Sequence, residues 1–168
     1  EISIIEKDEI SLLNSGRAFF DGDNYQNGNK KSYTISTKGI AAPSVSLNVQ
    51  FVSTNGSKLN VTADSTAFST ITIRNIAEYE FGILVSRTFT FEKSLTESST
   101  VTLLHTRDTG ISGHLDYIIT CYTRKLDLAG SNYLAFRSQD NSSSKRYAIN
   151  GANEHTSVWC VSTPNKTY

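Results

Sequence analysis

The stretch LDYIITCYTRKLDLAGSNYLAFR, residues 115–137, decides the fold class of this 168-residue chain. Residues 117–122 alternate with a period of two, which places successive side chains on opposite faces of a strand. β-branched and aromatic residues dominate there, and they suit a pleated, half-buried surface. Gly130-Ser131-Asn132 then supplies a turn, after which Leu134 and Phe136 are expected to face inward, opposite to Tyr133. The stretch predicts two strands of a sheet core joined by a turn.

Similar alternation recurs along the chain, most cleanly at 45–51. Asn55-Gly56 predicts a hairpin turn after this strand, and the segments 87–91 and 101–105 are expected to form a strand pair. Further strands are expected at 2–5, 33–36, 59–63, 71–76, 147–149 and 157–161. Only 77–84 could form a helical turn, and it is short. Many short strands predict an all-β fold, an antiparallel β-sandwich that is jelly-roll-like.

The totals favour one exported domain. A chain of 168 residues suits a single sandwich over 1–168. Lys plus Arg and Asp plus Glu are 16 each, so the chain lacks the basic field that attracts nucleic acid. No run approaches the ~20 apolar residues of a membrane span. There is no Met, even at position 1, so the chain is expected to begin at a processed or cloned boundary.

Both cysteines, Cys121 and Cys160, fall in expected strands. Two buried apolar thiols are the favoured interpretation, and a disulfide between adjacent strands is the alternative that an exported protein would permit. No CxxC or Cys/His spacing suggests a structural zinc site.

The segment LHTRDTGISGHLDY, residues 103–117, is rich in groups that could carry chemistry. A general acid/base pair or a metal site could be built from its His105, Arg107, Asp108, His114 and Asp116. Their spacing fits no known motif, however, and polar residues gather in loops for other reasons. The sequence therefore predicts no catalytic residue and no metal ligand here.

Two other features have a plain structural interpretation. Asp21, Asp23 and Asn24, in a loop over 21–31 that is expected at the surface, suggest calcium ligands, but Tyr25 and the lack of a closing Glu favour an ordinary turn. Trp159 could stack on a sugar if exposed, yet its valine neighbours favour a core or interface role, and its ring is expected to face inward. No cofactor fingerprint is present.

Three segments in the same order along the chain carry a family resemblance. They are Gly16-Arg17-Ala18-Phe19-Phe20; then LDYI at 115–118 with Arg124, Leu126, Gly130, Leu134, Phe136 and Arg137; and finally Val158-Trp159-Cys160-Val161-Ser162-Thr163-Pro164. Together they resemble the N-terminal β domain of the gingipain-related cysteine endopeptidases. The resemblance is closest to the signal peptidase (sortase) of the type IX secretion system of Bacteroidetes.

The chain departs from that family's pattern at its end. Cys160 and Thr163 stand where the family has Asp, so any contact that those acids make with a following domain is altered. Neither Cys121 nor Cys160 matches a catalytic position. The family's catalytic Cys and His lie in a caspase-like domain beyond the last matching segment, and this chain ends at Tyr168. The resemblance therefore implies a fragment of a larger exported protein.

The resemblance implies a non-catalytic accessory or scaffold domain at the outer-membrane surface or outside the cell. Its expected partners are an adjacent peptidase domain and other cell-surface proteins, with no cofactor. The alternative is a jelly-roll carbohydrate-binding module of a secreted bacterial protein, which an exposed row of aromatic rings on a concave sheet would favour. An enzyme in its own right would require the His/Asp cluster to line a pocket.

Overall fold

The computed structural model describes residues 1–12, 18–25, 29–128, 130–137 and 146–159. It is divided into two compact units, Glu1–Arg124 and Lys125–Tyr168. Every strand of the described residues lies in the first unit, and these residues contain no helix, hence none long and apolar enough to span a membrane.

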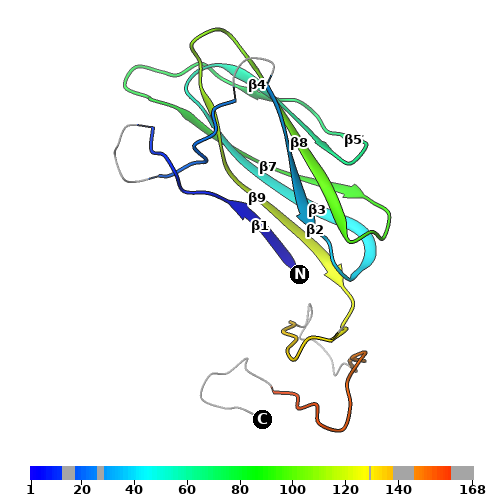
Figure 1. The fold of residues 1–168 in the computed structure, drawn as a ribbon. Helices are drawn as coiled ribbons and strands as arrows, with labels where there is room; N and C mark the ends of the chain where they lie inside the picture. The colour runs from blue at the N-terminus through cyan, green and yellow to red at the C-terminus, as the bar shows by residue number, and fades with distance from the viewer. Residues whose placement is uncertain (13–17, 26–28, 129, 138–145, 160–168) are drawn as a thin grey trace. The chain divides into compact units, whose positions relative to one another are not determined.

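The first unit is a sandwich of two antiparallel sheets (Figure 1). One sheet has the order β1-β9-β3-β7, formed by Ile2–Glu6, Gly113–Arg124, Ile40–Ser53 and Ile83–Glu92. The other has the order β2-β8-β4-β5, formed by Asn29–Ser36, Ser98–Arg107, Ser57–Ala63 and Thr66–Ala67, and β6 (Ile71–Ile73) also pairs with β4. The predicted all-β, antiparallel sandwich is confirmed.

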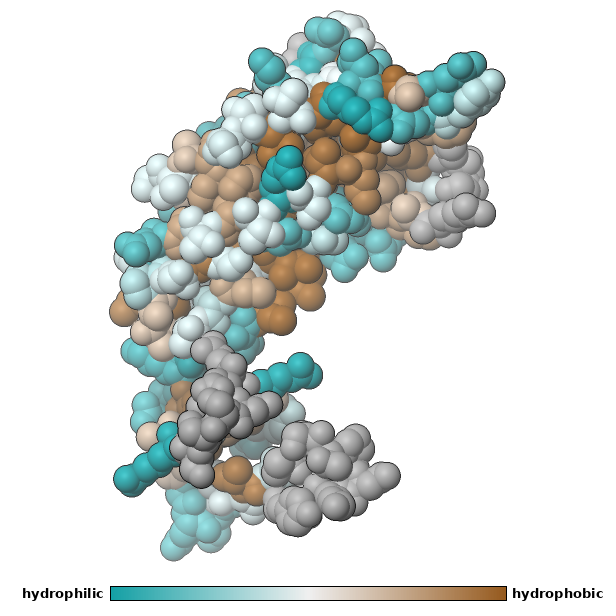
Figure 2. Space-filling view, turned by 180° about the vertical axis from the view of Figure 1, so that it is seen from behind, coloured by the Kyte–Doolittle hydropathy of each residue, from teal (hydrophilic) through white to brown (hydrophobic). Residues whose placement is uncertain are grey.

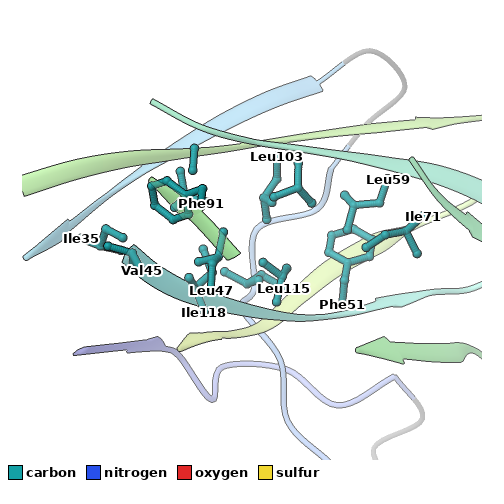
Figure 3. Packing of buried hydrophobic residues seen from close by; sticks show 14 of the residues in the cluster. Ile35, Val45, Leu47, Phe51, Leu59, Ile71, Phe91, Leu103, Leu115 and Ile118 are labelled. Atoms are coloured by element: carbon teal, nitrogen blue, oxygen red, sulfur yellow. The ribbon is translucent and has the colours of Figure 1, made fainter. Parts of the chain in front are cut away.

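The core lies between the two sheets, where alternate side chains of each strand point toward the opposite layer (Figure 3). From β3, Val45, Leu47, Val49 and Phe51 are all fully buried, as their alternation predicted. They meet residues of the other sheet, including Ile35, Leu59, Val61 and Leu103. Because buried apolar area drives folding at roughly 25 cal/mol per Å², this interleaved layer is the main source of the sandwich's stability.

The strand pairing differs from two sequence predictions. Asn55-Gly56 does not close a hairpin, because β3 pairs with β7 and β9 while β4 pairs with β8, so the turn carries the chain from one sheet to the other. The Asn55 side chain holds this crossing by accepting hydrogen bonds from the Gly56 and Ile76 amides at 2.8 and 3.1 Å. Likewise β7 and β8 lie in opposite sheets and are not a pair.

Residues 133–137 form no strand, so the second half of the opening stretch was predicted wrongly. Phe136 is exposed and Leu134 only half-buried; Phe136 packs on Tyr147 with ring centroids 5.1 Å apart. The strand expected at 147–149 is also absent, and the second unit's described pairing is a single bridge between Asp127 and Asn150. Alternation of apolar residues was too weak a signal here, because no partner strand is present among the described residues to bury the apolar side chains.

The sandwich thus occupies the first unit of the chain. That residues 1–168 are one piece of a larger exported protein, without its catalytic domain, stays a prediction.

Candidate functional site

Two polar segments that are far apart in the sequence meet at one end of the sandwich. From β8, His105 Nδ1 lies 3.4 Å from the Tyr25 carbonyl oxygen, and Arg107 Nε donates to the same oxygen at 2.9 Å. From β9, His114 Nδ1 lies 3.0 Å from the Asp21 carbonyl oxygen. Since a carbonyl only accepts, both imidazoles donate from Nδ1. Both histidines therefore fix the loop that contains Asp21 and Tyr25.

The surroundings keep these imidazoles neutral. Burial lowers the pKa of His105 to about 4, against the weaker opposing effect of its hydrogen bond to Tyr25, while nearby Arg107 and His114 lower this pKa further. Burial also lowers the pKa of His114, despite hydrogen bonds to backbone carbonyls. A neutral imidazole whose Nδ1 proton is already donated to a carbonyl is positioned as a structural donor.

Ser53 is a further buried polar side chain at this end. Its Oγ lies 3.5 Å from His105 Nε2, an arrangement that resembles a nucleophile beside a general base. Both side chains are fully buried, and the Ser53 hydroxyl donates to the Asn55 carbonyl at 2.8 Å. No substrate can reach this pair, so it serves the fold.

The remaining members of the predicted cluster are not brought to the same place. Asp108 is exposed after β8. The carboxylate of Asp116 accepts a 2.5 Å hydrogen bond from the Gln50 side chain, which in turn accepts one from Tyr117 at 2.9 Å. The five residues therefore divide among three surroundings and do not line one pocket.

The loop over 21–25 is only in part the surface loop that the sequence predicted: residues 22–24 are exposed, whereas Asp21 and Tyr25 are buried and plug the end of the sandwich, and residues 29–31 begin β2. Tyr25 is fully buried, with its ring edge-on to Phe51 at 5.3 Å between centroids and its hydroxyl 2.5 Å from that of Tyr33. Burial raises the pKa of Tyr33 to about 12 and raises that of Tyr25 still further. A lone aromatic in a polar loop was the available signal for this plug.

The oxygens proposed as calcium ligands have partners within the protein. Asp21, which is buried, accepts from the Asp23 amide at 3.0 Å and lies 3.8 Å from Lys7. Asp23 pairs with Lys31 at 3.2 Å, and the Asn24 side-chain oxygen accepts from the Gly113 amide at 3.3 Å. Within the described ranges, no three His, Cys, Asp or Glu side chains gather as metal ligands.

An apolar groove of about 200 Å³ lies on the surface of the described part of the chain. Leu12, Ala18, Phe20, Val52, Phe81 and Leu84 line it. Phe20 and Val52 form its buried floor, whereas Phe81 and Leu84 are 58% and 51% exposed. A Cβ added at Gly82 would lie 2.9 Å from the Leu12 side chain and 3.1 Å from that of Val52, so a larger residue there would have to displace them. Figure 2 shows hydrophobic surface interrupting the polar coat on one face of the molecule.

Two predictions for the C-terminal part and the cysteines are corrected. Trp159 is 69% exposed and Val158 is exposed as well, so neither is the inward anchor that was expected; Val161 lies outside the described residues. Cys121 is exposed on β9 and is not a buried thiol, while Cys160 lies outside the described residues, which leaves the predicted alternatives for it untested. Of the first resembling segment, only Ala18, Phe19 and Phe20 are described.

Comparison with known proteins gives likeness in fold. No family model matches the chain, and no curated protein does. Among solved structures, PorU of Porphyromonas gingivalis matches 76% of this chain with a TM-score of 0.60 at 15% identity, and the match spans 13% of the PorU chain. A CBM36 domain of a multidomain xylanase from the hindgut metagenome of Trinervitermes trinervoides covers 73% of this chain and 98% of its own, with 14% identity and a TM-score of 0.46. A family 35 carbohydrate-binding module from Clostridium thermocellum covers 73% and 92%, with 8% identity and a TM-score of 0.44.

Proposed function

We propose that this chain is a non-catalytic accessory domain that acts as a scaffold and docking surface for a peptidase domain of the same, larger exported protein. The observation that carries the proposal is the apolar groove with its half-exposed Phe81 and Leu84. Exposed apolar surface of this kind marks sites of interaction with other protein surfaces.

The chemistry of the polar residues supports a non-catalytic role. A catalytic base needs access to substrate and a pKa near the working pH. His105 and His114 are instead buried and hold backbone carbonyls. Cys121, the described thiol, is exposed on β9 opposite Ile2 and Ser46 of the neighbouring strands, and neither of these could activate it as a histidine would.

The family resemblance supplies the identity of the partner. The LDYI segment, which belongs to that resemblance, lies in β9, in the middle of the sandwich. The fold likeness to PorU spans a small part of the PorU chain, which is compatible with one domain of a larger protein. In this proposal, the protein acts at the cell surface or outside the cell, and other surface proteins are further partners.

The first test asks whether the isolated chain cleaves peptides. We expect no cleavage of Arg, Lys or Ala peptide substrates in the presence of a reductant. Cleavage that is lost in Cys121→Ala or Cys160→Ala would contradict the accessory role.

The second test concerns the docking surface. In the full-length gene product, Leu84→Asp should make limited proteolysis between the domains faster than in the parent protein. Thr90→Asp, an exposed change on the same strand, should leave the rate of proteolysis unchanged.

The carbohydrate-binding alternative stays a prediction and is tested with the same protein. All strongly exposed aromatic rings of the described residues lie outside the strands, and Tyr79 is the most exposed of them. On a glycan array we expect no specific signal. Glycan binding that Tyr79→Ala abolishes and Tyr133→Ala leaves intact would favour the carbohydrate-binding module over the docking domain.

A further inference from the structure

The edge of the sandwich formed by β1 is open among the described residues. β1 pairs with β9 on one side, and no described strand pairs with its other side (Figure 1). Its outward-facing Ile2 and Ile4 are 62% and 56% exposed. An edge strand presents unpaired N–H and C=O groups, which are a template for another strand.

The hydrogen bonds to β9 identify the residues whose backbone faces this edge. Glu1 and Tyr122 exchange two bonds, of 2.9 and 3.1 Å, and so form a hydrogen-bonded pair. In an antiparallel ladder such pairs alternate with non-hydrogen-bonded ones. Ser3 and Ile5 are therefore bonded to β9, whereas Ile2, Ile4 and Glu6 direct their N–H and C=O groups outward.

The other edges of the sandwich carry features that discourage pairing. β2 has Lys30 and Lys31, β5 has only two residues, and β7 has the exposed Arg87 in its middle. Charged residues and short strands are the usual protection of sheet edges. By contrast, β1 reads Ile-Ser-Ile-Ile-Glu, with no charge before its last residue.

We propose that two copies of this chain pair through β1, antiparallel and centred on Ile4. In this register Ile4 lies opposite Ile4 of the second copy, and Ile2 lies opposite Glu6. All outward backbone groups of both strands then meet, because each of these pairs exchanges two N–H···O=C bonds. The same surface of each copy forms the interface, and a two-fold axis relates the two copies, as in most dimers. The sheet β1-β9-β3-β7 continues into that of the second copy.

The charges beside β1 fit the same register. Glu1 comes opposite Lys7 of the second copy at both ends of the strand pair, so opposite charges face each other. Within its own chain, Glu1 lies 3.5 Å from Arg124 and Lys7 lies 3.8 Å from Asp21, which are long contacts that allow a further partner. A short edge-to-edge contact is small as interfaces go, so the dimer is expected to be weak and to depend on concentration.

Disulfide trapping tests the register. In a Cys121→Ser, Cys160→Ser background, Ile4→Cys should form a covalent dimer on mild oxidation, because the paired Cα atoms would be about 5.5 Å apart, within the range of about 4.4–6.8 Å for a disulfide. Ile2→Cys is the matched control. Its two copies would lie roughly 13 Å apart along the strands and should not be linked. Equal trapping of both variants, or of neither, would overturn the proposal.

Sedimentation velocity over a range of concentrations tests the dimer without a cross-link. The unmodified chain should shift from monomer to dimer as its concentration rises. Ile4→Lys should abolish the shift by placing two like charges opposite each other, whereas Thr90→Lys, on the edge strand at the other side of the sheet, should preserve it. Circular dichroism would confirm that both variants are folded. A chain that is monomeric throughout, or a dimer that survives Ile4→Lys, would overturn the proposal.

Discussion

The two ends of the sandwich are both closed by buried polar side chains, but they are closed in different ways. At the histidine end, made by His105, His114 and the loop 21–25, neutral rings donate to backbone carbonyls of a distant segment. At the lysine end, Lys93 donates to the Thr37 hydroxyl at 2.6 Å and to the Thr96 and Ser98 carbonyls at 3.1 and 2.9 Å. β8 runs from the lysine end to the histidine end.

The comparison of the two ends shows that a buried ionisable group need not mark a functional site. Burial lowers the pKa of Lys93, with nearby Asp64 opposing the shift, yet each donor of its ammonium group has an acceptor. Its three hydrogen bonds offset much of the cost of burying the ammonium group, so the fold can hold it there without a functional role. The histidine end looked functional in the sequence only because its polar residues are neighbours along the chain.

The largest expected effect concerns the ring that the histidine end packs against. Phe51 is fully buried, with its centroid 5.0 Å from that of His105 and 5.3 Å from that of Tyr25. Phe51→Ala should lower the free energy of unfolding by about 3–5 kcal/mol, because it leaves a cavity. Urea denaturation would measure this. The exposed Phe136→Ala is the control, and a comparable loss there would show that the second unit shares the sandwich core.

A smaller effect should appear as a pH dependence of stability. The unfolded chain protonates His105 near the ordinary value of 6.5, and the folded chain only near a pKa of about 4. Acid therefore favours the unfolded state: the stability is fully present above pH 6.5 and falls as the pH drops from 6.5 to 4, by about 3 kcal/mol at most.

Thermal unfolding between pH 7 and 4 would check this window. His105→Gln should lower stability at pH 7 and flatten the pH dependence, since glutamine does not titrate. The exposed His155→Gln is the matched control and should leave the slope unchanged. An unchanged slope in His105→Gln would mean that this ring does not govern acid unfolding.

The smallest of the three effects belongs to the lysine end. Lys93→Met keeps an apolar stem but removes the donors to Thr37, Thr96 and Ser98. Buried acceptors that lose their donor cost about 1–3 kcal/mol in the free energy of unfolding. Lys58→Met, on the exposed face of β4, should change it by less than about 0.5 kcal/mol. Equal values for the two variants would remove the distinction between a buried and a surface lysine.

The presence of a strand could be predicted from the sequence where apolar and polar residues alternate. Val45 to Phe51 and the segment that begins at Leu115 both form strands, because period-two burial is a local property of the chain. The pairing of strands could not be predicted. Asn55-Gly56 reads as a hairpin in isolation, but the adjoining strands have better partners elsewhere, and the turn crosses between layers.

The contacts of the polar residues in 103–117 could not be predicted for a related reason. The residues of 103–117 were grouped because they are close in sequence, whereas their contacts are set by strand direction and by the loop at 21–25. The burial of Lys93 could not be predicted either, because its distant acceptor Thr37 is joined to the nearby Thr96 and Ser98 carbonyls only in the folded chain. The groove has the same character, because Leu12, Val52 and Leu84 meet only in the folded chain.

The pairing of β1 with β9 has a consequence for the order of assembly. Glu1 binds Tyr122, so the first strand of the sandwich cannot be seated until the last one has been made. Contacts of such long sequence separation slow folding, because the intervening chain must be closed into a loop first. While the chain is being synthesised, Ile2, Ile4 and Ile5 have no partner strand beside them until β9 is made. Until β9 is made, β1 is thus an unpaired apolar strand, and such strands are prone to aggregate.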